Sequence, residues 1–230
     1  MAAKICVSIA PDNVTSIKEQ AHRAFILGAD YVEIRFDFLE ADFLAEALQA
    51  SKDIKDRAIF TLRSSSEGGK FAGSEQNRLQ WLATFAELKP MLLDIELDTL
   101  KKNDELADFL EEQKSRILVS WHDFEKTPPN DEIADMLSEM MTYSNYVKVV
   151  TTAKSIEDAL RLLEMYNETT IELHPIFFAM GEAGVISRVL CTLVGNAPFT
   201  YASLERVLAP GQLTLIQIKK LYDKITYGKA

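Results

Sequence analysis

The stretch Tyr143–Ala153, YSNYVKVVTTA, is a short run of β-branched and aromatic residues with one lysine, Lys148, near its centre. Such a run predicts a buried strand, and helical patterns lie on either side of it at 131–143 and 155–166. Strands that alternate with amphipathic helices form parallel βαβ units. Because a buried ammonium without a partner is costly, the lysine in this strand needs an explanation.

The same alternation extends along the whole chain of 230 residues. Short apolar runs are separated by segments with helical periodicity. The runs predicted as strands are 4–10, 30–36, 57–63, 91–97, 116–122, 146–152, 171–180 and 198–203. Eight strand–helix units in a chain of this length predict an α/β fold of the (β/α)8 TIM-barrel class, with residues 1–230 as a single domain.

A doubly wound open sheet is the alternative fold. When such a sheet binds a dinucleotide, it usually has a glycine-rich turn after its first strand. The segment SIAPDN at 8–13, where the first predicted strand ends, contains no glycine.

Several residue types mark the expected ends of helices. Asn13, Ser74 and Asn130 stand where an N-terminal cap would be, because their side chains can accept a hydrogen bond from a free backbone N–H. Gly28 stands just before the second predicted strand and suits the end of the first helix.

Charge and composition limit the partners. The net charge is −10, and an acidic surface repels nucleic acid and anionic membranes, so neither is expected as a partner. The two cysteines lie in apolar runs, and no long apolar segment suggests secretion or membrane insertion, so a cytoplasmic location is expected. The three histidines are scattered without ligand spacing, which predicts no metal site.

Polar side chains recur on one face of the predicted strands, toward the carboxyl ends where barrel enzymes build their active sites. They are Glu33, Arg35, Arg63, Asp94, Glu96, Ser120, His122 and Lys148. For the acidic residues and Arg35, structural ion pairs are an equally good explanation. For Arg63, His122 and Lys148 together a purely structural role is much less plausible, because a barrel that only needs to fold would place valine, isoleucine or leucine there.

A lysine beside a histidine indicates a particular chemistry. A desolvated lysine near other cations has a lowered pKa, and its neutral amine can attack a ketone or aldehyde. The iminium that forms acidifies the neighbouring C–H, and a histidine can remove that proton and later return one to a leaving group. Arginines would bind a carboxylate. The residues thus predict a Schiff-base enzyme for a small anionic carbonyl compound, and they leave aldol cleavage, dehydration and isomerisation open.

Six motifs, in order along nearly the whole chain, together resemble type I 3-dehydroquinate dehydratase. They are YVEIRFDFL, FTLRSSSEGGKF, VSWHDFEKTP, YVKVV, FFAMGEAGVISRVL and APGQL. The resemblance implies dehydration of 3-dehydroquinate to 3-dehydroshikimate and water, the third step of the shikimate pathway toward the aromatic amino acids. It also implies that no metal or organic cofactor is needed, and it suggests a homodimer.

The resemblance implies a role for each matching residue. Lys148 matches the Schiff-base lysine, His122 the general acid and base, and Glu67 the carboxylate that orients the histidine. The positions that match substrate-binding residues are Ser8, Glu33, Arg35, Arg63, Arg188 and Gln212. Ser187 is expected to cap a helix, which would place Arg188 at a helix N-terminus, where anions are favoured.

The chain departs from the family pattern at Leu208, where many members have a serine that contacts the substrate. That contact is either lost or supplied by another group, such as Ser203 or water. Two other functions remain open: a class I aldolase-like Schiff-base lyase acting on another small anionic ketone, and a barrel that binds a carboxylate without catalysis.

Overall fold

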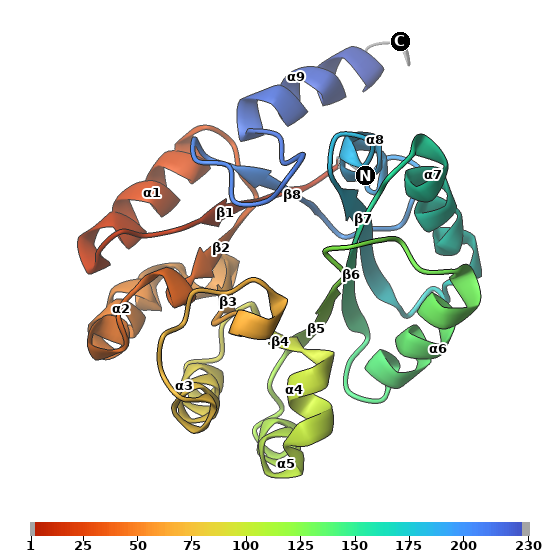
Figure 1. The fold of residues 1–230 in the computed structure, drawn as a ribbon. Coiled ribbons are helices and arrows are strands. Elements are labelled where there is room, and N and C mark those ends of the chain that lie inside the picture. Colours follow the sequence, from red (N-terminus) through yellow and green to blue (C-terminus); the bar gives the residue numbers. More distant parts are fainter. Residues whose placement is uncertain (1–2, 227–230) are drawn as a thin grey trace.

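The structure is a computed structural model that describes residues 3–226. Within them, eight parallel strands lie in the order β7-β6-β5-β4-β3-β2-β1-β8 and curve into a nearly closed barrel (Figure 1). Their bounds are β1 Ile5–Ile9, β2 Tyr31–Arg35, β3 Ala58–Thr61, β4 Leu92–Glu96, β5 Ile117–His122, β6 Tyr146–Thr152, β7 His174–Met180 and β8 Thr200–Ser203. The predicted (β/α)8 fold in a single domain is therefore confirmed.

Helices connect the strands and surround the barrel (Figure 1). The α-helices are α1 Val14–Ile26, α2 Leu44–Ser51, α3 Glu75–Glu87, α4 Leu97–Lys102, α5 Asp104–Glu112, α6 Asn130–Met141, α7 Ile156–Glu164, α8 Val185–Leu190 and α9 Leu215–Thr226. A short 3-10 helix, η4 at Ser65–Glu67, follows β3 and contributes a residue to the site described below. Across residues 3–226, no helix has the length and apolar character that crossing a membrane requires.

Apolar side chains fill two separate layers. The layer between the strands and the helices includes Ile34, Phe60, Phe85 and Val149. The layer inside the barrel includes Ile59, Leu118, Val150, Ile176 and Phe199. Because successive strand residues point to opposite faces, Lys148 faces the barrel interior together with Val150.

Parallel pairing places the polar interior residues beside one another. Ser120 of β5 lies opposite Glu96 of β4 on one side and opposite Lys148 of β6 on the other. Ser8 of β1 lies opposite Glu33 of β2. The register therefore brings side chains that are far apart in sequence to the same end of the barrel.

Hydrogen-bonded strand pairing is interrupted at one place, because the described strands β7 and β8 form no ladder with each other. Side chains close this seam. The rings of Phe178 and Tyr201 lie 6.0 Å apart, and the Thr200 hydroxyl donates to the backbone carbonyl of Arg188 at 2.6 Å. The β7 side of the barrel thus meets β8 through packing and α8 rather than through backbone hydrogen bonds.

The expected helix ends are mostly confirmed. Asn13 caps α1 by accepting from Ser16 N, Ser74 caps α3 by accepting from Asn77 N, and Gly28 follows α1 at φ +94°. That φ lies in the left-handed region, where glycine has no Cβ penalty.

Two boundary predictions are wrong. Asn130 is the first residue of α6 rather than its cap, and its side-chain oxygen instead accepts from Arg161 at 3.2 Å. The seventh strand begins at His174, not at residue 171, because a turn precedes it: Leu173 N donates to Thr170 O, and the Ile171 side chain is 98% exposed.

Candidate active site

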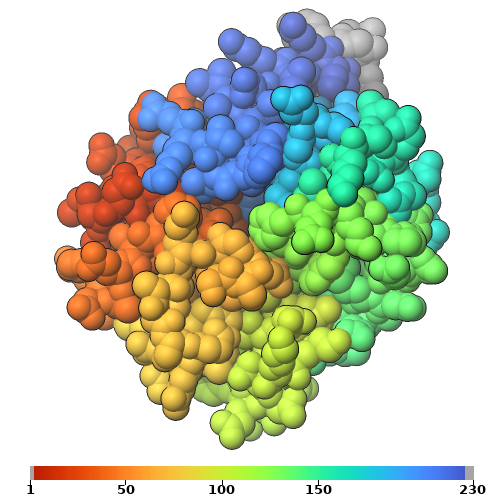
Figure 2. Space-filling view, in the orientation of Figure 1, coloured from red at the N-terminus to blue at the C-terminus, as the bar shows by residue number. Residues whose placement is uncertain are grey.

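A cavity opens at the carboxyl ends of the strands, and all nine predicted site residues line it. They are Ser8, Glu33, Arg35, Arg63, Glu67, His122, Lys148, Arg188 and Gln212. In Figure 2 the segments around 64–75, 120–130 and 204–212 meet over the barrel axis on this face. Residues 3–226 contain no group of three or more His, Cys, Asp or Glu side chains that could hold a metal ion.

Lys148 lies at the middle of β6 with only 3% of its surface exposed. Its Nζ forms an ion pair with Asp94, lies 3.6 Å from Glu33 Oε1, and lies 5.0 Å from the centre of the Tyr201 ring. Both ion-pair partners of this amine are carboxylates, whereas from the sequence only cations were considered near the lysine. The buried ammonium therefore has the partners that its burial requires.

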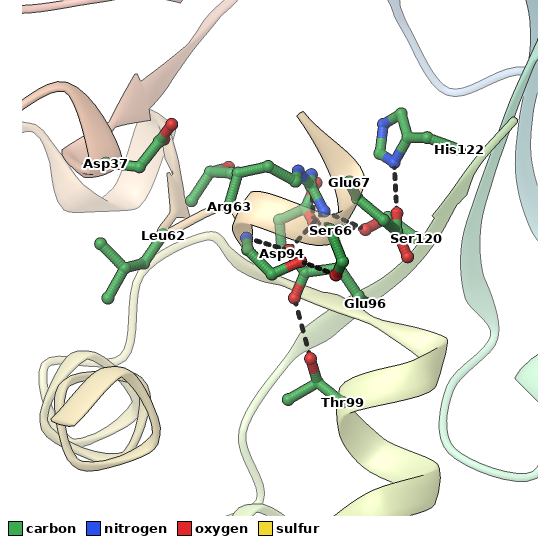
Figure 3. A network of polar contacts seen from close by, with 12 residues as sticks. Asp37, Leu62, Arg63, Ser66, Glu67, Asp94, Glu96, Thr99, Ser120 and His122 are labelled. Carbon is green, nitrogen blue, oxygen red and sulfur yellow. Dashed lines mark hydrogen bonds and ion pairs between the residues drawn. The ribbon is translucent and has the colours of Figure 1, made fainter. Parts of the chain in front are cut away.

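Asp94 is held by three donors. Its Oδ1 accepts from Arg63 Nη2 at 2.7 Å and from the Ser120 hydroxyl at 2.6 Å (Figure 3). Its Oδ2 accepts from Lys148. The cationic Arg63 and Lys148 outweigh the effect of burial and hold the pKa of Asp94 well below its usual range. Asp94 is therefore ionised throughout the physiological pH range.

The ion pairs continue beyond Asp94 to the outside of the barrel. Arg63 Nη1 donates to Glu96 Oε1 at 3.0 Å, and Glu96 Oε2 accepts from Arg78 Nη1 at 3.0 Å. Arg78 belongs to α3, is 1% exposed, and also donates to Thr99 at 2.6 Å. The terminal nitrogens of Arg63 are thus engaged by protein oxygens, although Arg63 was expected to contact the substrate; that contact stays a prediction.

His122 ends β5, and its Nδ1 lies 2.7 Å from Glu67 Oε2 (Figure 3). Burial raises the pKa of Glu67 to about 8. The positive charge of Arg63 lowers this pKa, and the negative charges of Glu96 and Asp94 raise it. Burial lowers the pKa of His122 well below its usual range, and Arg63 and Lys148 add to that shift. At neutral pH the pair therefore consists of a neutral imidazole and a protonated carboxyl group.

The turn after β3 fixes the position of Glu67. Gly69 N donates to Ser64 O at 2.8 Å, and this tight turn brings the backbone so close that a Cβ on Gly69 would lie 1.9 Å from Arg63 O. Ser64 N in turn donates to Glu96 Oε1 at 2.9 Å. The loop that carries Glu67 is thus attached to the same ion-pair network that holds Asp94.

Arg188 is buried without an acidic partner. Its guanidinium lies 4.4 Å from the centre of the Phe178 ring, and Nη2 reaches only Pro210 O at 3.5 Å. Nε has no hydrogen-bond partner, and within residues 3–226 no carboxylate pairs with the side chain. Burial lowers its pKa to about 10.

The expected helix N-terminus at Arg188 is wrong. Helix α8 begins at Val185, so Arg188 lies in its last turn, and Ser187 is inside the helix. The Ser187 hydroxyl instead donates to Gly184 O at 2.6 Å and accepts from Ala179 N at 2.8 Å. The Arg188 guanidinium therefore lies near the C-terminal end of α8, away from the positive end of the helix dipole.

Leu208 lies in the loop after β8, next to the cavity. The Gln212 side-chain oxygen accepts from Leu208 N at 2.9 Å, and both residues line the cavity. Ser203 does not replace the missing serine contact: it is fully buried, its hydroxyl has no partner, and it does not line the cavity.

Both charged residues of β2 have ion-pair partners, Asp37 for Arg35 and Lys148 for Glu33. Arg35 donates through Nε and Nη2 to the two carboxylate oxygens of Asp37, at 2.7 Å each. Glu33 instead accepts from the Thr61 hydroxyl at 3.1 Å and approaches Lys148. The two neighbouring charges of β2 therefore do not pair with each other, and Glu33 is left to face the amine.

Sequence reasoning missed three features of this site. Asp94 was noted but not assigned to the site, although its position on the interior face of β4 was the available signal. Tyr201 and Phe178 line the cavity, and nothing in their apolar surroundings distinguishes them from ordinary interior residues.

The fold and the cavity define a (β/α)8-barrel protein whose site combines one amine, one imidazole, carboxylates and guanidinium groups. Residues 5–229 match the family model described as Type I 3-dehydroquinase. The chain therefore belongs to the type I 3-dehydroquinase family and is a lyase, and the resemblance noted in its sequence is confirmed. Membership supports the dehydration step of the shikimate pathway.

Individual relatives agree with the family match. A 3-dehydroquinate dehydratase from Dehalococcoides mccartyi is 36% identical over 203 residues, which cover 87% of this chain and 88% of that protein. The 3-dehydroquinate dehydratase structure from Geobacillus kaustophilus has the same fold, with a TM-score of 0.88 at 24% identity, covering 99% of this chain and 92% of that one. The type I enzyme of Clostridium difficile, with covalent modified comenic acid, has a TM-score of 0.86 at 28% identity, covering 98% and 93%.

Proposed function

We propose that this enzyme dehydrates 3-dehydroquinate to 3-dehydroshikimate and water through a Schiff base on Lys148, with His122 as the general acid and base. The observation that carries the proposal is that the Lys148 amine and the His122 imidazole come from hydrogen-bonded neighbouring strands and line one cavity. Family membership supports the substrate and the overall reaction.

The first stage forms the imine. The Lys148 nitrogen attacks the C3 ketone of the substrate, and His122 moves protons through the carbinolamine. Summed over this stage, an ammonium and a ketone become an iminium and one water molecule, so the positive charge stays on the nitrogen. The carboxylates of Asp94 and Glu33 lie beside that nitrogen.

The second stage eliminates water. The iminium acidifies the C2 hydrogen, which His122 removes to give an enamine. The enamine expels the C1 hydroxyl group, which leaves as water after accepting the proton from His122. Addition of water to the new iminium then releases 3-dehydroshikimate and restores the lysine.

Arg188 is the best candidate for binding the substrate carboxylate. Its guanidinium is buried, its Nε has no partner, and it lines the cavity. A buried donor without a partner is costly, and an incoming carboxylate would satisfy it. The Clostridium difficile relative with covalent modified comenic acid supports a small acid as the kind of molecule that this family accommodates.

The remaining cavity wall is suited to a polyhydroxylated ring. We propose that Ser8, Glu33, Arg35 and Gln212 contact the substrate hydroxyl and carboxylate groups, since each lines the cavity. Glu67 orients His122 through the Nδ1 contact. A single substitution at each of these residues can therefore test its proposed role.

Reductive trapping examines the proposal directly. With 3-dehydroquinate present, borohydride is expected to reduce the iminium and attach the substrate skeleton to Lys148, which peptide mass mapping identifies. Lys154, which is exposed just after β6, serves as the internal control and should stay unmodified. A label at another residue, or no label while turnover continues, would contradict the assignment.

The ultraviolet absorbance of the conjugated product distinguishes the other functions. Incubation with 3-dehydroquinate should give a rising enone absorbance. An aldolase-like lyase would trap a Schiff base with other ketones but give no enone from this substrate. A barrel that only binds carboxylates would bind 3-dehydroquinate, measured by calorimetry, without turnover.

The Glu67–His122 pair predicts a pH dependence. Below about pH 8 the Glu67 carboxyl group is protonated and donates to His122 Nδ1, so Nε2 carries the proton and cannot act as a base. As pH rises through about 8, Glu67 ionises and accepts from Nδ1–H, which frees the Nε2 lone pair. We expect kcat/KM to rise through that pH and then to level off.

Glu67→Gln is the matched variant for this pH prediction. It removes the titrating carboxyl group but keeps an oxygen that can accept from Nδ1–H, so the rise in kcat/KM should move to lower pH. An unchanged profile in this variant would assign the titration to another group.

We also infer that the protein is a cytoplasmic homodimer. Free, buried thiols at Cys6 and Cys191 support a reducing compartment. Helix α9 exposes three large apolar side chains, Ile216, Leu221 and Ile225, which support association of two copies. Light scattering across a concentration series should give twice the mass of the chain, and a monomer at every concentration would contradict the dimer. Cell fractionation should recover the protein together with cytoplasmic enzymes.

A further inference from the structure

Asp94 touches the reactive amine but does not line the cavity. Its side chain is fully buried behind Lys148, and its second oxygen is occupied by Arg63 and Ser120. The substrate therefore has no direct access to this carboxylate in the structure, while the nitrogen of Lys148 remains in contact with it. A group placed in this way acts on the nitrogen, not on the substrate.

We infer that Asp94 is a catalytic residue that serves as the counter-ion of the Lys148 nitrogen, first as ammonium in the resting enzyme and then as iminium in the covalent intermediate. This inference rests on the proposed Schiff-base function. Asp94 would stabilise the positive charge on the Lys148 nitrogen, which stays at the same place while the ammonium becomes an iminium.

The chemistry requires such a counter-ion. When the ammonium and the ketone become an iminium and water, the C=O bond and two N–H bonds break. The C=N bond and the two O–H bonds of water form, and the charge on nitrogen is unchanged. The iminium draws electrons from C2 only while it stays charged. A carboxylate fixed beside the nitrogen keeps the proton on the imine in a water-poor interior.

Two carboxylates lie near the amine, and their surroundings separate their roles. Asp94 forms the direct contact and accepts from two further donors, so its position and its charge are fixed. Glu33 lies 3.6 Å from the nitrogen, is hydrogen-bonded by Thr61, and lines the cavity. Glu33 is therefore placed to meet the substrate, whereas Asp94 is placed to stay with the nitrogen.

The network behind Asp94 keeps it ionised and in place. Arg63 bridges Asp94 to Glu96, and Glu96 is held in turn by Arg78 from α3 (Figure 3 shows the part around Arg63, Asp94 and Glu96). The charged and titratable groups around the nitrogen and Asp94 are Cys6, Glu33, Arg63, Glu67, Glu96, His122, Lys148 and Tyr201. In this set only Arg63 and Lys148 donate a charged hydrogen bond to Asp94.

Asp94→Asn is the test, because it removes the charge and keeps the shape. Cyanoborohydride reduces the protonated iminium, so the amount of Lys148 adduct formed with 3-dehydroquinate reports its charge at each pH. In the variant we expect the adduct yield to fall off at a pH lower by about one unit or more, and kcat to fall by about 10²-fold or more. An unchanged yield profile with wild-type kcat would overturn the inference.

Glu33→Gln is the matched control. It removes the other nearby carboxylate, and we expect mainly a higher KM, with a smaller displacement of the adduct profile than Asp94→Asn gives. A larger displacement than in Asp94→Asn would make Glu33 the counter-ion and overturn the inference.

Ser120→Ala keeps the test decisive if Asp94→Asn does not fold. It leaves the Asp94 charge but removes the 2.6 Å hydrogen bond that helps fix it. The adduct profile should move in the same direction by less, with kcat lower by roughly three- to tenfold, and no change would overturn the inference. Failure to trap wild-type Lys148 would instead contradict the proposed function, so the two outcomes are distinguishable.

Discussion

Lys148→Ala is expected to lower kcat by on the order of 10⁵-fold or more, because the reaction loses the nucleophile that converts the ketone into an electron sink. Lys148 is the one lysine among the described residues that lines the cavity, so no neighbouring amine can take its place. The measurement is the initial rate of enone absorbance with 3-dehydroquinate, together with the loss of borohydride labelling.

The fold of this variant should persist. Asp94 keeps its hydrogen bonds from Arg63 and Ser120 when the lysine is removed, so the remaining carboxylate is not left unpaired. Circular dichroism melting checks that expectation. Lys154→Ala is the matched control and should retain wild-type kcat, since its side chain is exposed. A Lys148→Ala variant within tenfold of the wild-type rate would contradict the Schiff-base proposal.

His122→Ala is expected to lower kcat by about 10²- to 10⁴-fold, the usual contribution of a positioned general acid and base. The imine should still form slowly, because the Lys148 nitrogen and its carboxylate partners do not hydrogen-bond to His122. Borohydride should therefore still label Lys148 in this variant, although turnover is slow. Stopped-flow absorbance and timed trapping separate the two stages.

A second histidine provides the control for this variant. His22 is exposed on α1, and His22→Ala should leave both turnover and trapping unchanged. An unaffected rate in His122→Ala would remove the histidine from its proposed role. A complete loss of borohydride labelling would show that His122 is required for imine formation, the step before proton removal.

Much of the fold could be predicted because it depends on local patterns. Apolar runs such as the one around Lys148 need two buried faces, and regular alternation with amphipathic segments leaves few architectures other than a barrel. The same argument located the site, since parallel strands bring their carboxyl ends together. The error at residue 171 arose where an apolar residue stands in a turn, which hydrophobic pattern alone does not separate from a strand.

The details of the site could not be predicted because they depend on which side chains pair across strands. Sequence parity places Glu33 and Arg35 on one face, yet Arg35 turns to Asp37 and Glu33 turns to Thr61 and Lys148. Which partner each side chain contacts depends on barrel curvature and on side-chain rotamers, and neither can be predicted from the pattern of residues along the sequence. The partner of Gln212 could not be predicted either: its side-chain oxygen accepts from Leu208 N within its own loop.

The row of buried charges from Lys148 through Asp94, Arg63 and Glu96 to Arg78 alternates in sign at every step. A change at an interior member, Asp94, Arg63 or Glu96, removes an ionic partner from both of its neighbours in a medium of low polarity, so the cost of the substitution extends beyond the residue replaced. Paired substitutions within the row should therefore be far from additive. Arg78 lies on an outer helix away from the chemistry, yet its replacement is expected to disturb the charges that hold the site, because it pairs with Glu96.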